Sequence, residues 1–490
     1  MRLMAPEFVL ILTALLILIV DFVFLKANKK YLLWLALTGL TGATCFLFLD
    51  WGHFGTTLGG RFATDTISSW FKFVFLLATF LTLSFSSNSF ESQRKPLTHR
   101  GEFLFVMLLT LVGMMFLISS RDLVSIYVSL ELATIPLFGL TAWERTEKSS
   151  EAGFKYLAIG ALGSGFLLYG MGLLYGITGQ TDLNLLSSGL AFGGMMPGGV
   201  VSEGIAGNPA TWFALGLVMA GLGFKLTLFP FHMWAPDAYD GAPTVVTAYL
   251  SVASKATGLA LAFLFLFQIF SVQLASMNTI IAIFATATMT LGNFAAIKQT
   301  NLKRLMAYSS ISQAGYLFMS FLGRDQMSVQ AMVYYMVVYV VTNLSLFSIL
   351  TLHIQESGNE EVKGLSGFSR TNPLYAFALM LALFGLAGIP PLSGFVGKFF
   401  LFSVAAKHGL YWLVFVAAIN STVSLYYYLR LVRQMYIEDP TPSSKALAKQ
   451  PLMVIGLTVA TAASILIGLV PQVYESIGLA AQSWVGLLGR

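Results

Sequence analysis

Six charged side chains fall inside stretches that otherwise have the composition of membrane-spanning helices. They are Lys72, Glu131, Lys155, Lys225, Lys255 and Lys398. A charge at the centre of a bilayer costs about 2.5–3.5 kcal/mol on insertion scales, so a chain with several must pair them, hydrate them or let them lose protons. Such residues in such positions indicate a path for protons or ions across a membrane.

The two groups best suited to proton chemistry are Glu131 and Lys225. Glu131 lies near the middle of the stretch IYVSLELATIPLFGL, and Lys225 directly precedes a proline-rich segment. Loss of water favours the uncharged form of either group, whereas a nearby opposite charge favours the charged form. We expect a pair in which the lysine's affinity for its proton depends on its distance from the glutamate. A static structural pair is the alternative, but apolar residues can replace such a pair at little cost.

Two further lysines extend this pair into a predicted proton relay. Lys255 lies in AYLSVASKATGLALAF, and Lys398 follows a second proline-rich break, where freed backbone carbonyls and water could solvate it. Taken singly, each could extend to the lipid interface or line a crevice. Together with Lys225 they form a row of bases at membrane depth, which is typical of a proton path.

Weaker candidates accompany this row. Lys155 lies about one helical turn inside its stretch, so its side chain can also extend to the membrane surface. Lys72 has no evident partner, which favours a structural role. The imidazole of His232 titrates near neutral pH and suits proton transfer, although a histidine at a helix break is often only a hydrogen-bonded structural residue. The remaining candidates are Asp237 and Asp240, which we expect to cap a helix rather than feed protons, and Gln313.

Composition excludes most other kinds of protein. The 490 residues are 57% hydrophobic and 10% charged, with a mean hydropathy of +0.77, whereas soluble domains average about 25% charged residues. The net charge of +6 comes mostly from loops, so nucleic acid is not an expected partner. Cys45 is the only cysteine and the histidines are scattered, so we expect no metal site, no cofactor bound by this chain and no redox centre on it.

Hydropathy predicts an all-α membrane protein with about fourteen spans of roughly 20 residues. No small-residue cleavage site follows the first apolar run, so we expect it to be retained as a helix rather than removed as a signal. The expected spans are 6–25, 31–49, 63–83, 102–120, 123–143, 152–177, 211–231, 244–269, 276–297, 303–322, 329–354, 374–401, 410–436 and 451–473.

Proline interrupts two of the spans. Pro230 and Pro236 break the seventh span, and Pro390 and Pro391 break the twelfth. Two breaks five spans apart predict inverted five-helix repeats, spans 4–8 and 9–13, with an ion path at their interface. The expected domains are a three-helix segment at 1–101, the first repeat at 102–270, the second repeat at 271–437, and the last span with its tail at 438–490.

Loop charges predict the orientation of the chain in the membrane. With both termini on the outer (periplasmic) side, 17 of the 28 lysines and arginines lie in inner loops and 6 lie outside, the rest being the intramembrane lysines. Cytoplasmic loops are the ones enriched in lysine and arginine. We therefore expect a multi-pass protein of a bacterial inner membrane with both termini outside.

Four segments resemble the antiporter-like membrane subunits of respiratory complex I and the related Mrp antiporters. They are SLELATIPLFGL, FKLTLFPFHMWAPDAYDGAPTVVTAYLSVASK, NLKRLMAYSSISQAGY and LAGIPPLSGFVGKFFLF. Within this family the chain resembles the subunit N branch. It is too short for subunit L, it is expected to end after fourteen spans, and it has Lys398 where subunit M has a glutamate.

The resemblance implies roles and partners. Glu131 and Lys225 match the family's glutamate–lysine pair, Lys255 matches the connecting lysine, and Lys398 matches the residue of the second half-channel. Lys155 and His232 match polar residues on the hydrophilic axis, whereas Gln313 stands where relatives often have histidine. The implied function is proton translocation within NADH:quinone oxidoreductase. NADH, FMN, iron–sulfur clusters and quinone then belong to other subunits, and the neighbours are subunit M, small subunits K and J, and the lateral helix of subunit L.

Three alternatives remain open. An Mrp-type cation/proton antiporter subunit would transport cations without NADH oxidation, but Glu131 is the only clear mid-membrane carboxylate to bind them. A purely structural spacer predicts that the buried lysines can be neutralised without loss of pumping. An organic-solute transporter would require a broad polar pocket, for which the sequence has no signature.

Overall fold

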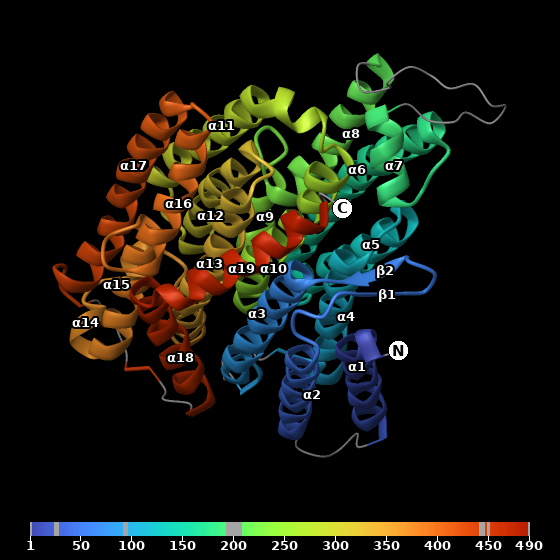
Figure 1. Ribbon diagram of the computed structural model, residues 1–490. Coiled ribbons are helices and arrows are strands. Elements are labelled where there is room, and N and C mark those ends of the chain that lie inside the picture. The colour runs from blue at the N-terminus through green and yellow to red at the C-terminus, as the bar shows by residue number, and fades with distance from the viewer. Residues whose placement is uncertain are drawn as a thin grey trace.

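The computed structural model describes residues 2–23, 29–91, 97–192, 208–440, 446–447 and 451–488. The described chain is an assembly of closely packed helices with one short β-hairpin (Figure 1). Of the loop residues counted for the orientation, those outside the described part are Lys26, Arg94, Lys95, Lys445, Lys449 and Arg490. Residues 193–207 of the loop predicted at 178–210 also lie outside it.

The α-helices of the first half and the hairpin follow in chain order. They are α1 (Ala5–Val23), α2 (Lys30–Leu49), β1 (Gly55–Thr57), β2 (Phe62–Thr64), α3 (Thr66–Glu91), α4 (Arg100–Ser119), α5 (Leu123–Thr141), α6 (Glu147–Thr178), α7 (Leu183–Phe192), α8 (Pro209–Leu226), α9 (Trp234–Gly241) and α10 (Thr244–Ala262).

The second half continues this series. Its α-helices are α11 (Asn278–Ile297), α12 (Leu302–Phe318), α13 (Gln326–Ser357), α14 (Phe368–Thr371), α15 (Pro373–Ala387), α16 (Ser393–Lys407), α17 (Tyr411–Tyr436), α18 (Pro451–Leu469) and α19 (Pro471–Leu488). A π-helical turn, η3 (Phe263–Ile269), extends α10, and short 3₁₀ turns are η1 (Arg2–Met4), η4 (Gln273–Met277), η5 (Met319–Leu322) and η6 (Val362–Leu365).

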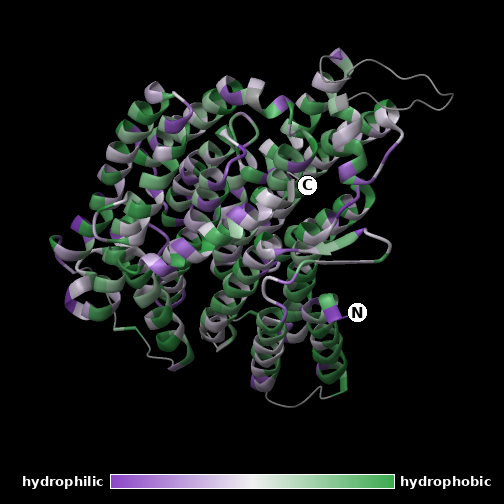
Figure 2. Cartoon of the chain, in the orientation of Figure 1, coloured by the Kyte–Doolittle hydropathy of each residue, from purple (hydrophilic) through white to green (hydrophobic). Residues whose placement is uncertain are grey.

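Fourteen predicted spans correspond to helices of this bundle. Twelve of the described helices are long and apolar enough to cross a membrane. The tenth span is the 17-residue α12, and the twelfth is divided into α15 and α16. The outer helices are mainly apolar along their length (Figure 2), as expected of a surface that contacts lipid. A bilayer requires every backbone group to be bonded within the protein, which helices achieve.

Several elements were not predicted, among them α7, a 10-residue helix within the predicted loop at 178–210. A two-stranded antiparallel hairpin, β1–β2, connects α2 to α3. The chain also does not end after its fourteenth span, because α19 follows and runs across α13 and α3 (Figure 1). Gln330 at the start of α13 donates a hydrogen bond to the Tyr474 carbonyl of α19 at 2.8 Å. The ring of Trp484 lies 4.9 Å from that of Phe263.

Both predicted breaks occur, with the same local pattern. α8 ends at Leu226, Thr227 adopts a left-handed conformation with φ 61°, and a cis Phe229–Pro230 bond follows. α15 ends at Ala387, Gly388 has φ 84°, and a cis Pro390–Pro391 bond follows. Pro236 does not contribute to a break, which corrects the prediction. It lies in the first turn of α9, where the backbone nitrogen has no intrahelical partner to lose.

Further features of the fourth to eighth spans have counterparts in the ninth to thirteenth spans. α6 and α13 are each 32 residues long, and each ends at a left-handed glycine. The residue preceding α5, Asp122, forms an isolated β-bridge to Asp182 after α6, and the residue preceding α12, Asn301, forms one to Glu361 after α13. These pairs support the predicted five-span repeats.

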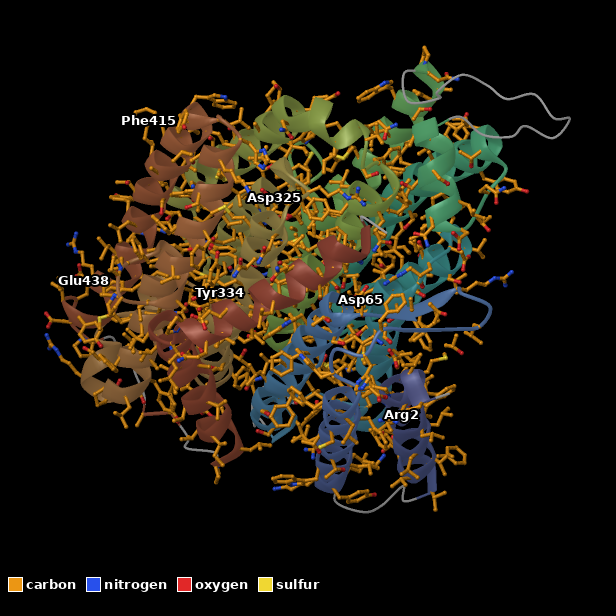
Figure 3. All side chains as sticks on the ribbon, viewed as in Figure 1. Arg2, Asp65, Asp325, Tyr334, Phe415 and Glu438 are labelled. Atoms are coloured by element: carbon orange, nitrogen blue, oxygen red, sulfur yellow. The ribbon has the colours of Figure 1, made fainter. Side chains whose placement is uncertain are left out.

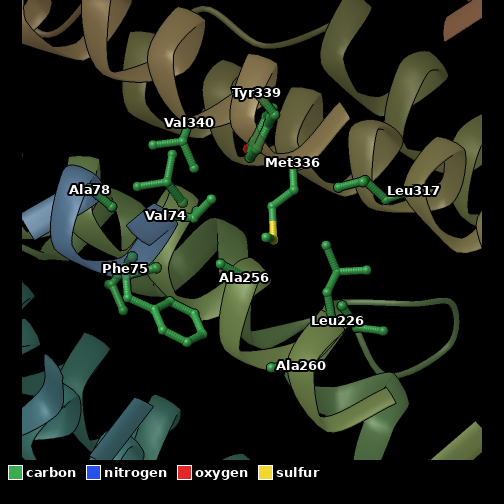
Figure 4. Packing of buried hydrophobic residues seen from close by; sticks show 14 of the residues in the cluster. Val74, Phe75, Ala78, Leu226, Ala256, Ala260, Leu317, Met336, Tyr339 and Val340 are labelled. Carbon is green, nitrogen blue, oxygen red and sulfur yellow. The ribbon is translucent and has the colours of Figure 1, made fainter. Parts of the chain in front are cut away.

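The centre of the bundle is formed by α10 and α13, whose apolar stretches are completely buried. Figure 4 shows the packing there, where Ala78 of α3 and Ala256 of α10 leave room for Met336 and Val340 of α13. In a helix buried on every side, each polar side chain needs a hydrogen-bond partner inside the protein, because water cannot supply one. Several polar side chains of α10 and α13 accordingly bond to neighbouring helices.

Candidate functional site

Lys225 lies in the last turn of α8, where the helix is about to break. Its side chain is 3% exposed. The ammonium nitrogen donates a hydrogen bond to the hydroxyl oxygen of Thr134 on α5, at 2.5 Å. The acceptor is a neutral hydroxyl, so this contact does not neutralise the positive charge of Lys225.

Glu131 lies one turn before Thr134 on the same helix. No ion pair within 4.0 Å joins it to Lys225 in the described chain, which corrects the expected direct pair, although the two are close enough to interact electrostatically. The half-buried carboxylate interacts with the Tyr127 hydroxyl one turn earlier. Its Oε1 accepts no hydrogen bond from a described residue. The lysine is therefore bonded to Thr134, and the glutamate lies one turn away from Thr134 on the same helix.

Lys255 of α10 points at the break in α8. Its ammonium nitrogen donates to the Thr227 hydroxyl oxygen at 3.0 Å, and that hydroxyl donates to the Leu226 carbonyl at 2.5 Å. The side chain of Lys255 is 1% exposed. Because Thr227 follows Lys225 by two residues, the two lysines lie on either side of one helix break.

Lys398 occupies the corresponding break in the second half. Its ammonium nitrogen donates to the Ala387 carbonyl at 3.0 Å and to the Ser421 hydroxyl of α17 at 3.1 Å. It also lies 4.6 Å from the centre of the Tyr316 ring, a cation–π distance. The expectation that carbonyls freed by the break solvate this lysine is confirmed.

Gln313 of α12 connects the elements around Lys398. Its side-chain amide donates to the Leu386 carbonyl at 3.1 Å, and its oxygen accepts from the Tyr335 hydroxyl of α13. The same amide lies 3.4 Å from the Tyr428 hydroxyl of α17, which pairs with Ser309. An amide does not titrate, so Gln313 holds the surroundings of the lysine by hydrogen bonding.

Hydrogen bonds also join α10 to α13 between the two lysine sites. Asn343 of α13 donates to the Ser251 hydroxyl at 2.5 Å, and Tyr339 donates to the Ser251 carbonyl at 3.0 Å. The sequence analysis missed these residues, as well as the acceptors Thr134, Thr227 and Ser421. Hydroxyl and amide residues are common in membrane helices. Only the three-dimensional structure shows which of them accept a hydrogen bond from a lysine and which merely pack between helices.

Lys155, Asp237 and Asp240 belong to a charged cluster at one end of the bundle. The Lys155 side chain is 44% exposed and pairs with Glu151 at 2.8 Å and Asp237 at 3.1 Å. Arg304 also pairs with Asp237, and Asp240 pairs with Lys148. The prediction that these aspartates cap a helix is wrong, because Met233 and Pro243 occupy the cap positions of α9 and α10, and neither helix start has a side-chain cap hydrogen bond. The aspartates form ion pairs instead. Lys155 extends to the surface in the way expected of a residue one turn inside.

A cleft opens beside this cluster. Its volume is about 980 Å³, and it reaches the start of α10 at Pro243 and Thr244. Lys303 and Glu360 line it and form an ion pair at 2.9 Å. Burial works to raise the pKa of Glu360, but the ion pairs with Lys303 and Lys148 outweigh it, so that this pKa lies below its ordinary value.

His232 lies in the segment between α8 and α9, away from the row of lysines. Its ring is half-buried and stacks on Phe229 with centroids 5.9 Å apart. The neighbouring Phe229 and Met233 are exposed, so this segment reaches the lateral surface. Among the described residues, no hydrogen-bond partner contacts its Nδ1, and the structure does not bring it to Lys225.

Lys72 has a partner, contrary to the expectation. Its ammonium lies 2.7 Å from a carboxylate oxygen of Glu7 on α1, and the two side chains are 1% and 0% exposed. The Phe62 ring lies 4.9 Å from the same nitrogen. The bundle therefore contains the fully buried carboxylate of Glu7 in addition to the half-buried one of Glu131.

Within the described chain, no three histidine, cysteine, aspartate or glutamate side chains gather into a group that could hold a metal ion. The site is accordingly a set of buried amines that hydroxyl and carbonyl oxygens surround, at two helix breaks. Such an arrangement can gain, hold and release protons. The expected lack of a cofactor stays a prediction.

Known proteins share this sequence and architecture. A family model described as "NADH:quinone oxidoreductase/Mrp antiporter, TM" matches residues 120–424. The chain is 36% identical over 483 residues to NADH-quinone oxidoreductase subunit N of Dehalococcoides mccartyi, covering 96% of this chain and 97% of the relative.

Solved structures agree with the sequence comparison. A chain of respiratory complex I from Thermus thermophilus has a TM-score of 0.78 and 29% identity, covering 95% of this chain and 97% of its own. A chain of the Mrp complex from Dietzia sp. has a TM-score of 0.84 at 20% identity, with coverage of 97% and 96%. The second likeness concerns the fold alone.

Proposed function

Because the chain belongs to the family of NADH:quinone oxidoreductase and Mrp antiporter membrane subunits, we propose that its protons pass along Lys225, Lys255 and Lys398. The relatives identify a proton-translocating membrane-arm subunit of NADH:quinone oxidoreductase, a multi-pass membrane protein. The observation that carries the proposal is shared by the three lysines. Each is buried, and each donates to neutral oxygens at or beside a helix break.

The geometry supports a specific role for Glu131. Lys225 rests on Thr134, one turn from the glutamate, and a turn of helix is about 5.4 Å. A small movement of α5 against α8 would bring the ammonium to the carboxylate or take it away. Approach favours the protonated lysine, and separation favours release of its proton. The proton then has Lys255 as the next base, on the far side of the same break.

The second half provides the continuation. Asn343 and Tyr339 connect α13 to α10, and Gln313 with Tyr335 connects α12 to α13 near Lys398. These side chains form the polar surroundings through which a hydrogen-bonded path runs between the halves. In this proposal Lys398 is the terminal base, and Gln313 keeps the Leu386 carbonyl in place beside it.

The cleft beside Lys303 and Glu360 is the proposed proton opening on the inner side. It ends at the first turn of α10, the helix that carries Lys255. The loops with the excess of lysine and arginine are the ones expected on the cytoplasmic side, so in this proposal both termini lie outside. Lys155 and the aspartates of α9 then hold the rim of the cleft by ion pairs. We assign His232 no step in the relay.

Electron transfer takes place outside this chain in the proposal. NADH, FMN, the iron–sulfur clusters and quinone belong to partner subunits, since this sequence has one cysteine and no nucleotide motif. The proposed neighbours in the membrane arm are antiporter-like subunit M, small subunits K and J, and the lateral helix of subunit L. Energy from quinone reduction reaches this subunit as a displacement of the helices that carry its charges.

Proton uptake in inverted membrane vesicles tests the proposal. Lys225→Ala is compared with Lys363→Ala, which removes an exposed lysine from η6, and native gels verify assembly of both complexes. NADH-driven uptake and NADH:quinone turnover are expected to fall together in Lys225→Ala and to stay unchanged in the control. Uptake and turnover as high as in the control, in an assembled Lys225→Ala complex, would contradict the relay.

A cation/proton antiporter subunit of the Mrp type is the second candidate. The observation that favours it is the equally close fold likeness to an Mrp complex. The buried Glu7 and the half-buried Glu131 are available as ligands, but Lys72 already occupies the first. Sodium-driven proton movement in vesicles without NADH, abolished by Glu131→Gln, would support this candidate. NADH-linked activity that depends on the chain excludes a stand-alone antiporter.

A further inference from the structure

The buried pair of Glu7 and Lys72 lies outside both proposed repeats. It joins α1 to α3 at 2.7 Å, and neither side chain is more than 1% exposed. Glu7 lies in the first turn of α1, so its carboxylate is close to the end of the bundle where the hairpin lies. The second carboxylate oxygen accepts no hydrogen bond from a described residue. It is a free acceptor for a proton.

Lys72 belongs to a polar face of α3 that runs from one end of the helix to the other. Successive residues of this face are alternately three and four positions apart, a spacing that keeps them on one side of a helix. Apart from Phe75, every position is polar and buried: Asp65, Ser68, Lys72, Thr79, Thr82, Ser86 and Ser89. Lipid-facing helices do not have such a face. The hydroxyls donate to backbone carbonyls three or four residues earlier in the cases of Ser68, Thr79, Thr82 and Ser86.

Contacts connect this face to its surroundings at three levels. Asp65, labelled in Figure 3, pairs at 3.0 Å with Arg121 at the hairpin end. Thr79 lies 3.2 Å from the Tyr249 hydroxyl of α10, which also contacts Thr110 of α4 at 3.1 Å. At the other end Ser89 accepts a hydrogen bond from Gln355 of α13. The middle contact reaches α10, the helix that carries Lys255.

We propose that Glu7 and Lys72 form an additional proton-exchange site, which serves the hairpin end of the membrane domain and communicates with α10 through the polar face of α3. The inference rests on the proposed function. In the exchange step an N–H bond of the Lys72 ammonium breaks and an O–H bond forms on the Glu7 carboxylate. The ion pair becomes a neutral amine beside a carboxylic acid, without a change of total charge.

The two directions of exchange follow from position. The carboxylic acid of Glu7 releases its proton toward the nearby end of the bundle, and the amine of Lys72 accepts the next proton from the side of Thr79. Between Lys72 and Thr79 lie two helical turns, about 10 Å, lined on this face by the buried ring of Phe75. This apolar interval keeps the site from leaking protons, and transfer across it requires the helices to move.

A double substitution separates this role from a structural one. Lys72→Met or Glu7→Gln alone leaves an unpaired buried polar group, which is strongly destabilising, whereas removing both members of a buried pair is often neutral. We therefore compare the Glu7→Gln/Lys72→Met complex with an Asp21→Asn/Lys29→Met complex. The control removes the more exposed 2.6 Å pair at the opposite end of α1.

Assembly, thermal stability and proton uptake per NADH are measured for both double variants. The expected result is normal assembly of both, with a loss of proton uptake per NADH only in Glu7→Gln/Lys72→Met. The infrared difference band of a protonated carboxyl group during turnover should also lose the contribution of Glu7. Normal proton uptake in this double variant would overturn the inference. If Lys225→Ala abolishes uptake in the same assay, the proposed function stands without this site.

Discussion

The two helix breaks present their lysines to different surroundings. In the first half Lys225 precedes the break, donates to the Thr134 hydroxyl and has Glu131 one turn from that acceptor. In the second half Lys398 follows the break and donates to a backbone carbonyl and to the Ser421 hydroxyl, with a tyrosine ring beside it. A carboxylate is near the first lysine, whereas the contacts of the second are neutral.

The two surroundings suit the halves to different tasks. A carboxylate that moves relative to a lysine changes the lysine's proton affinity strongly, because the interaction is between full charges. A carbonyl, a hydroxyl and a ring change it less and keep their positions. The first half is therefore suited to respond to a driving displacement. The second half is suited to receive a proton and hold it in fixed geometry.

The largest effect among the substitutions that test this contrast is expected from Thr134→Val. It removes the single acceptor found for the Lys225 ammonium, and hydrogen bonds to charged groups contribute about 1.5–3 kcal/mol. Coupled NADH:quinone turnover and proton uptake should fall about tenfold or more. Thr134→Ser keeps the hydroxyl and should restore most of both rates. A Val variant with normal rates would mean that Thr134 does not position the lysine.

A smaller effect is expected from Ser421→Ala in the second half. The Ala387 carbonyl still accepts a hydrogen bond from Lys398 at 3.0 Å, so only one of two acceptors is lost and the ammonium keeps a partner. Turnover should fall a few-fold in the same vesicle assay. If Ser421→Ala and Thr134→Val reduced turnover equally, the contrast between a single and a shared acceptor would be wrong.

The smallest effect concerns the charged cleft rather than either lysine site. The lowered pKa of Glu360 means that its ion pairs stabilise the fold at neutral pH. This contribution is present above the unfolded-state pKa and disappears as the pH falls through the lower folded-state value. Glu360→Gln should reduce thermal stability at pH 7 by no more than about 1 kcal/mol and leave stability unchanged in strong acid. Equal losses at both pH values would exclude an ionic contribution.

Hydropathy and proline were sufficient to predict the spans and the two breaks. A run such as that of α1 has too few polar groups to be anything but a membrane helix, and Pro390 with Pro391 cannot continue α15. The positions of Lys225 and Lys398 beside those breaks followed from the same reasoning, whereas the contact of Lys255 with the first break did not. Local chemistry therefore determined most of the architecture and the residues that could titrate.

Contacts between distant segments could not be predicted in this way. Glu7 lies in the first turn of its helix, where a carboxylate is favourable even without a partner, so its pairing with Lys72 some sixty residues later had no local signal. Thr134 and Thr227 resemble the many other hydroxyl residues of membrane helices. The aspartates of α9 looked like caps because their ion-pair partners, such as Arg304, come from other helices.

The last helix has a consequence for how the chain is made. α19 rests on α13 and on α3, so it joins a segment of the first hundred residues to a central helix of the bundle. Among the described helices it is synthesised after all the others. The surface of α3 that contacts α19 therefore stays uncovered in the bilayer until residues 471–488 have been made. This contact forms late, although α3 itself is made early.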